Sequence, residues 1–236
     1  MKKVQTLSVS LPEGVENIRT SEDNTEVETR ENYEQYFSLV EASKLSLNDE
    51  FLKNTPQTKK QEEFKQMVVE AIKSGLSDFK AQTIDPSVDE NGKIYYKPGS
   101  KPGIGYSPNW WHKNAIKVVP GKSRQGTTVE RIVFLAVLIK SGLATLEQIC
   151  DHSEEIGHYR DSEDAKYDFE ETGSRPVGEF YDLGNTCKIT ENKEDGGFSF
   201  VGGDYYNFGS NYPLANVGDV GNPCNNYYYG VGWLVF

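Results

Sequence analysis

Apolar and polar residues alternate with helical periodicity in the first half of the chain. Within residues 58–74 the apolar side chains from Phe64 to Ile72 fall three and four positions apart, so they share one face of a helix. Gly75 follows as a helix stop. The pattern predicts an amphipathic helix whose apolar face is buried.

A second helix is predicted where the apolar pattern becomes continuous. The run Ile132–Ile139 contains no polar residue, and it is far too short to cross a bilayer, so it is interpreted as a buried helix. Thr127 and Glu130 have the spacing of a capping box at its start, and Gly142 marks its end. Residues 143–152 predict a third, shorter helix.

The last third of the chain changes to short strand-like pieces separated by Gly, Asn and Asp. An earlier Asn91-Gly92 pair predicts a tight turn, followed by a strand over residues 93–96. Helices followed by strands predict an α+β fold. The later strands are expected at Val177–Tyr181, Cys187–Thr190, Phe198–Val201 and Val231–Phe236.

Residues 1–57 are polar and irregular, with an acidic patch between Glu22 and Glu34. We expect an N-terminal arm or oligomerisation segment there, which leaves the existence of a homo-oligomer open. The segment 58–236 is expected to form one domain. No apolar stretch follows the two N-terminal lysines, so no secretory signal is expected, and a phage virion or the cytoplasm fits equally well.

Charge limits the classes of partner. The net charge is −11 and the pI about 4.9, with no stripe of Lys or Arg. Nucleic acid is therefore not expected as a partner, because its binding needs a basic face. Insertion into a membrane, or attraction to an anionic one, is not expected either.

Three stretches that resemble motifs of cofactor or metal binding lack a required residue or the required spacing. Residues 120–123 lack the earlier glycine of a phosphate loop, since Ile116 stands there, and residues 87–98 lack the carboxylates of a calcium loop. The acidic stretch from Cys150 to Asp168 matches no closed zinc pattern and is interpreted as a solvated loop. We expect no cofactor and no metal. The three cysteines, Cys150, Cys187 and Cys224, are expected to be reduced structural thiols.

Three pieces of the last third occur in an order that resembles a known family. They are Pro176–Asn185 (PVGEFYDLGN), Phe198–Tyr205 (FSFVGGDY) and the terminal Val231–Phe236 (VGWLVF). Together they resemble the C-type-lectin-like domain of the formylglycine-generating enzyme family. The resemblance implies a C-type-lectin-like fold of that subgroup, here with an N-terminal extension.

The chain departs from the motifs of this family and of the calcium-dependent lectins in two ways that bear on its expected activity. The family's oxidase chemistry needs two cysteines in the segment before the last strand, and this segment contains only Cys224. Calcium-dependent lectins use an EPN or QPD loop and a WND strand, whereas this chain has Asn222-Pro223-Cys224 and no Trp-Asn-Asp. The expectation is a binding protein and not an enzyme. A formylglycine-generating-type oxidase relative, with Cys224 as its reactive thiol, remains the enzymatic alternative.

The subgroup that the chain resembles best contains the variable proteins of diversity-generating retroelements, among them phage receptor-binding proteins. In these proteins, mutagenesis restricted to adenines changes AAY codons, which cannot then become Lys, Glu, Gln, Met or Trp. Those five types make up 54 of residues 1–203, so about seven are expected among the 27 residues 204–230, as far as average composition holds. None occurs there. A Gly/Asn-rich loop that avoids long side chains by chance is the alternative.

The composition of residues 204–230 also favours recognition on physical grounds, because Tyr and Phe give rigid contact area while Ser, Gly and Asn give adaptable hydrogen bonds. The expected partner is a protein or glycan on a target surface, with a fixed partner of a lectin-like interaction domain as the alternative. Substitutions between Tyr205 and Tyr229 are expected to change binding far more than stability. The predicted ligand-binding residues are Tyr205, Tyr206, Asn207, Phe208, Ser210, Asn211, Tyr212, Asn216, Asp219, Asn222, Asn225, Asn226, Tyr227, Tyr228 and Tyr229.

Overall fold

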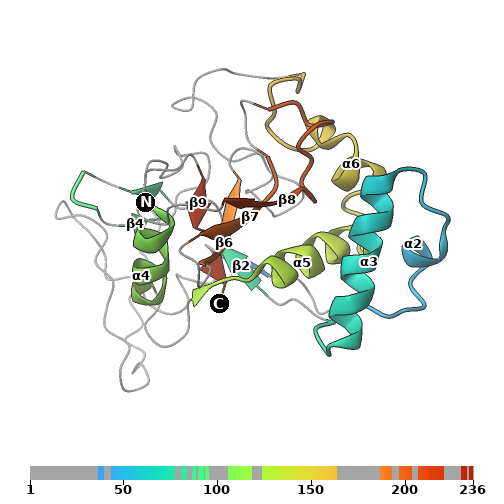
Figure 1. Cartoon of the computed structure of the whole chain (residues 1–236), viewed down its shortest axis with the longest axis horizontal. Helices are drawn as coiled ribbons and strands as arrows, with labels where there is room; N and C mark the ends of the chain where they lie inside the picture. Colours follow the sequence, from blue (N-terminus) through green and yellow to red (C-terminus); the bar gives the residue numbers. More distant parts are fainter. Residues whose placement is uncertain are drawn as a thin grey trace, which may run out of the picture.

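The chain combines helices and small sheets, which confirms the α+β class (Figure 1). The fold is that of a computed structural model. It describes residues 37–39, 44–77, 81–83, 87–88, 90–92, 94–95, 106–118, 124–163, 187–192, 197–203, 207–220, 230–232 and 234–235.

The helix α3 (Lys59–Lys73) confirms the amphipathic pattern of residues 58–74. The Thr58 hydroxyl caps it by accepting from the N–H of Gln61, and Gly75 follows with a φ of 93°. The apolar face packs on α5 (Thr128–Lys140), and the two helices lie side by side in Figure 1. A single short turn, α2 (Glu50–Lys53), precedes α3.

The helix α5 begins and ends where the sequence predicted. The Thr127 hydroxyl accepts from the N–H of Glu130, and the Glu130 carboxylate accepts in return from the N–H of Thr127, so the capping box is complete. Every residue from Ile132 to Leu138 is buried, which confirms the buried helix. Gly142 follows with a φ of 71°.

The predicted helix over residues 143–152 is real but shorter. The helix α6 spans Leu146–Cys150, because Thr145 supplies a second capping box with Gln148 and therefore sets a later start. A 3-10 turn, η1 (Ser153–Glu155), follows directly. Residues of this α6–η1 corner accept hydrogen bonds from the main chain of the segment predicted to bind ligand.

One sheet joins the two ends of the described chain. Its antiparallel order is β1 (Phe37–Leu39), β2 (Ala81–Thr83), β10 (Leu234–Val235) and β5 (Arg124–Gln125). Leu45 is also buried in the core that α3 and α5 form. The described part of the predicted N-terminal segment 1–57 therefore contacts the 58–236 segment through a strand and a core residue.

A second sheet has the order β8 (Val217–Val220), β7 (Phe198–Val201), β6 (Lys188–Asn192) and β9 (Val231–Gly232). Neighbouring strands are antiparallel except β6 and β9, which run parallel. The strands β6, β7 and β9–β10 confirm the expected pieces, whereas Val177–Tyr181 lies outside the described residues. The strand β8 was not predicted and lies within residues 204–230, the predicted binding segment.

This second sheet lies between α4 (Pro108–Val118) and α5, with the two helices on either side in Figure 1. Trp111 of α4 is fully buried against Phe198 and Ile189. Val201, three residues after Phe198, packs into the other core with α5, as the alternation of a strand requires. The helix α4 had not been predicted.

A small hairpin completes the described fold. The strands β3 (Ser87–Val88) and β4 (Ile94–Tyr95) pair antiparallel, and Gly92 in the turn has a φ of 77°. The Asn91-Gly92 turn is thus confirmed. The hairpin also places Val88 and Ile94 against the Trp111 cluster.

Candidate binding surface

The structure describes residues 207–220 and Gly230 of the predicted binding segment 204–230. None of the seven predicted binding residues in this range is buried. Asn207 and Asn216 are half-buried, and Ser210, Asn211 and Asp219 are exposed. Phe208 and Tyr212 are large side chains with 42% and 47% exposure. The remaining predicted residues, Tyr205, Tyr206, Asn222, Asn225, Asn226, Tyr227, Tyr228 and Tyr229, lie outside the described residues.

Residues 207–212 form one compact turn. The carbonyl of Phe208 accepts hydrogen bonds from the N–H groups of Asn211 and Tyr212, both at 3.0 Å. The guanidinium of Arg160 lies over the Phe208 ring, 5.2 Å from its centroid. The turn therefore presents an aromatic side chain that is stacked on one face and a second one, Tyr212, that is about half exposed.

Scaffold residues hold this segment through its main chain. The first half of the segment is bound by Asp161, which accepts from the N–H of Gly209 at 2.8 Å, and by the ammonium of Lys60, which donates to the carbonyl of Ser210. The N–H of Arg160 donates to the carbonyl of Asn207 at 2.9 Å. These contacts use atoms that every residue type carries, so they do not depend on the side chains of 207 and 210.

The second half of the segment is held by the α6–η1 corner. The buried hydroxyl of Ser153 accepts from the N–H of Leu214 at 2.8 Å, and the carbonyl of Ile149 accepts from the N–H of Ala215 at 3.1 Å. Ser153 in turn donates to the carbonyl of Gln148 at 2.7 Å. Main-chain bonds therefore continue through the part of the segment that enters the core.

The expectation that substitutions between Tyr205 and Tyr229 affect binding more than stability conflicts with the burial of four residues in this stretch, the tightly packed Gly209 of the turn and three consecutive residues after it. Pro213, Leu214 and Ala215 are buried, and Leu214 and Ala215 belong to the core shared with α3 and α5. The sequence pattern did not separate them from their neighbours, because Pro, Leu and Ala also occur among the residues that AAY codons can reach by changes at adenines. The described part of the predicted binding segment thus begins with a largely exposed turn, residues 207–212, which a buried anchor, residues 213–215, follows.

The glycine pair that precedes the segment is fitted to it. Gly202 has a φ of 88°, a region that residues with a Cβ rarely enter, and its N–H donates to the carbonyl of Asn216 at 2.7 Å. A Cβ on Gly203 would stand 2.3 Å from the carbonyl oxygen of Tyr212. Both glycines let the strand β7 pass close to the returning chain.

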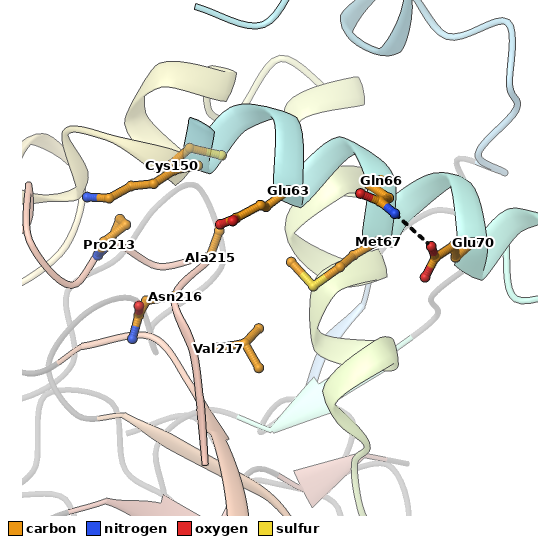
Figure 2. A pocket seen from close by; sticks show the side chains of 10 residues that line it. Glu63, Gln66, Met67, Glu70, Cys150, Pro213, Ala215, Asn216 and Val217 are labelled. Atoms are coloured by element: carbon orange, nitrogen blue, oxygen red, sulfur yellow. Dashed lines mark hydrogen bonds between the residues drawn. The ribbon is translucent and has the colours of Figure 1, made fainter. Parts of the chain in front are cut away.

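Asn216 lines a pocket of about 380 Å³ between α3 and the chain that enters β8 (Figure 2). Side chains of α3 form one wall, and the stretch 213–217 forms the other. Figure 2 shows Met67 extending from α3 toward Val217, with Glu63 and Glu70 on either side along the helix. The complete lining is Lys60, Glu63, Gln66, Met67, Glu70, Cys150, Pro213, Ala215, Asn216 and Val217.

Asp219 lies apart from the turn, on the edge strand β8. Its carboxylate accepts a hydrogen bond from the Ser199 hydroxyl at 2.8 Å, and the two residues are direct partners in the β7–β8 ladder. Asp219 is therefore exposed but already bonded within the sheet. The side chain of Asp219 thus has a structural partner in the neighbouring strand.

The described cysteines are free and buried. Burial in the core raises the pKa of the Cys150 thiol, with the neighbouring Asp151 carboxylate adding to the effect, so a thiolate there is disfavoured. Cys187 is also free and buried, and Cys224 lies outside the described residues. The described part of the chain thus offers two structural thiols.

The acidic stretch that follows α6 has structural partners. The Asp151 carboxylate accepts from the Thr58 hydroxyl at 2.8 Å and from the Gln61 amide at 2.7 Å, which joins the end of α6 to the start of α3. His152 lies 3.1 Å from Glu154. The hydrogen bond with Glu154, together with the negative charges of Glu154, Glu147 and Glu155, raises the pKa of His152. Among the residues with described placement, no three His, Cys, Asp or Glu side chains cluster as metal ligands would.

Sequence reasoning missed the scaffold residues of this surface. Lys60 and Asp161 contact the turn from positions 150 and 48 residues away in the chain, and local patterns carry no signal for such contacts. For the α3 wall of the pocket, the sequence predicted only an amphipathic helix. A charged pocket residue on the polar face of such a helix is indistinguishable in sequence from one that faces solvent alone.

Comparison of the chain with models of protein families, with curated proteins and with solved structures gives no match. No helix in the described ranges has both the length and the apolar character needed to cross a membrane.

Proposed function

We propose that this protein binds a ligand, a protein or glycan on a target surface, through the segment 204–230, and that this segment is diversified by a retroelement. The scaffold is assigned to the C-type-lectin-like fold, in the subgroup of the formylglycine-generating enzymes. The binding face includes the turn 207–212 and the neighbouring residue Asn216. The protein acts as a binding protein and not as an enzyme.

The observation that carries the proposal is the way the turn is held. Asp161, Lys60 and the Arg160 N–H all bond to main-chain atoms of residues 207–210. A turn fixed by its backbone keeps its shape when its side chains change. Such a turn suits a surface whose sequence varies while the domain stays folded.

The exposed side chains suit recognition. Phe208 and Tyr212 are each more than two-fifths exposed, and they stand beside the small polar residues Ser210 and Asn211. Aromatic residues with few torsions lose little entropy on binding, while the polar neighbours adapt their hydrogen bonds to the ligand. This mixture is the one that antibody paratopes use.

Two of the three sequence pieces that support the lectin-like assignment fall on strands. Phe198–Val201 is β7, and the terminal piece contains β9 and β10. The strands β7 and β9 lie on the two sides of β6 in one sheet, so both ends of the segment 204–230 start from the same support. The piece Pro176–Asn185 lies outside the described residues.

Deep sequencing of the 3′ end of this gene across a population of its source tests the proposal. We expect substitutions that trace to adenines and concentrate at the exposed or half-buried positions 207, 208, 210, 211, 212 and 216. The buried anchor Leu214 and the tightly packed Gly209 serve as internal controls, and they should stay constant. A segment as invariant as residues 124–163 would contradict diversification and leave a lectin-like domain with one fixed partner.

A further inference from the structure

The pocket between α3 and residues 213–217 combines an apolar floor with carboxylates. Met67 and Ala215 pack in the core or against it, and Val217 keeps 38% of its surface exposed. An exposed valine beside a hollow leaves apolar surface available to a ligand. The floor therefore suits an aliphatic chain of a few carbons.

The charges on the wall favour a cation. Glu63 and Glu70 are exposed and lie two turns apart on α3, with Met67 between them (Figure 2). The single basic side chain in the lining, Lys60, directs its ammonium to the carbonyl of Ser210. The lining thus carries two carboxylates against one ammonium that already has an acceptor.

The two carboxylates differ in their partners. Glu63 is 3.0 Å from the ammonium of Lys59, in an ion pair whose side chains are mostly exposed and which is therefore weak. Glu70 accepts a hydrogen bond from the uncharged amide of Gln66 at 3.2 Å, drawn as the dashed line in Figure 2. Among the described residues, Glu70 has no cation in ion-pair contact. Its negative charge is free for a cation from outside the chain.

We propose that this pocket receives an arginine or lysine side chain of a protein partner. The aliphatic stem lies against Met67 and Val217, and the cationic head meets Glu70, with Glu63 as the second carboxylate. The inference rests on the proposed function in one respect, that the cation is presented by a partner bound at the neighbouring turn. Asn216 belongs to both the pocket and the predicted binding residues, so the two surfaces are continuous.

The proposal is tested with small probes on the full chain. N-acetyl-arginine amide is titrated into ¹⁵N-labelled protein, and N-acetyl-citrulline amide, which has the same shape without the charge, is titrated in parallel. We expect amide shifts concentrated at residues 63–70 and 214–217 with the arginine probe. Because an exposed ion pair contributes little, the arginine probe should bind up to about fivefold more tightly than the citrulline probe, and added salt should reduce this difference.

Two variants assign the effect to the pocket. Glu70→Gln removes the charge with little change of shape, and it should bring the arginine probe down to the affinity of the citrulline probe. Glu62→Gln is the matched control, because Glu62 is exposed on the same helix but does not line the pocket. It should leave the fivefold preference in place.

Equal affinity for the two probes, shifts outside the pocket, or no shifts would each overturn the assignment. Equal weakening by both variants would also overturn it, since the effect would then come from the general negative charge. The probe titrations do not affect the outcome of the population sequencing. A failure of the pocket proposal can therefore be distinguished from a failure of the proposed function. A glycan probe that binds better than the arginine probe would contradict the proposal as well.

Discussion

The carboxylate of Asp161 accepts a hydrogen bond from the N–H of Gly209, with the oxygen and nitrogen 2.8 Å apart. Asp161 follows Arg160, which stacks on Phe208, so two consecutive residues hold the same turn by different means. One contact goes to the main chain and the other to a side chain. The first should therefore matter for the shape of the turn, whatever residue occupies position 208.

Replacing Asp161 with Ala should loosen the turn. The N–H of Gly209 would lose a charged acceptor, which costs about 1 kcal/mol of unfolding free energy at a partly exposed site. Hydrogen exchange at the Gly209 amide should accelerate, and urea denaturation should show the loss of stability. Glu163→Ala is the control, because Glu163 is exposed two residues further along. Equal exchange rates in the two variants would mean that Asp161 does not hold the turn.

Gly209→Ala should destabilise the protein although position 209 lies in a surface turn. An added Cβ would stand 2.3 Å from the main-chain nitrogen of Glu154 and 2.9 Å from its Cα, and these backbone atoms cannot swing aside. Overpacking of this kind costs about 1–3 kcal/mol. Ser210→Ala, one residue later and exposed, should change the unfolding free energy by less than about 0.5 kcal/mol. Thermal unfolding of both variants compares the two positions, and similar melting temperatures would contradict the packing argument.

Local chemistry explains which elements could be predicted from the sequence. The helix α5 has its capping box at Thr127 and Glu130 and its glycine stop at Gly142, so both ends were predicted within a residue. The strand β7 alternates between two cores and was predicted with its observed bounds. In each case the residues that set the bounds lie in the element or directly beside it.

Other elements depend on tertiary contacts. The strand β8 is four residues long and contains Gly218, a poor strand former that is required here because the ring of Phe200 would lie 2.2 Å from a Cβ. The buried anchor Leu214 has the same composition signal as its exposed neighbours. The pocket could not be predicted either, because its walls come together from α3 and from a segment far along the chain.

Stability should depend on pH through Glu130. Partial burial would raise the pKa of this carboxyl, but the Arg124 guanidinium and the Thr127 N–H outweigh that effect and hold the pKa below its usual 4.5. A lowered pKa in the folded state means that the stabilisation is present at neutral pH and is lost as the pH falls through the folded-state value.

The variant Glu130→Gln tests this dependence, because glutamine still accepts from the Thr127 N–H while it loses the charge that faces Arg124. We expect the variant to be less stable than the wild type by about 1 kcal/mol at neutral pH. The difference should disappear in acid, where the wild-type carboxyl is protonated. Urea unfolding over a range of pH measures it, and a difference that stays constant with pH would show that the charge has no part in it.

The division of the segment into turn and anchor predicts that substitution of Leu214 lowers the free energy of unfolding strongly, whereas substitution of Tyr212 hardly changes it. Leu214 is 1% exposed within the α3–α5 core, so Leu214→Ala should cost about 2–5 kcal/mol of unfolding free energy. Tyr212 is 47% exposed, and Tyr212→Ala should cost less than about 0.5 kcal/mol. Chemical denaturation of the two variants gives the comparison directly.

Leu214→Val serves as the milder control for the anchor, since it removes less volume and should fall between the wild type and Leu214→Ala. If Tyr212→Ala proved as damaging as Leu214→Ala, the tyrosine ring would be supporting the fold, and the turn could not vary freely. If both variants were harmless, the anchor would carry no core packing. The expected contrast between adjacent parts of one segment is what a scaffold needs in order to keep its fold while its binding residues change.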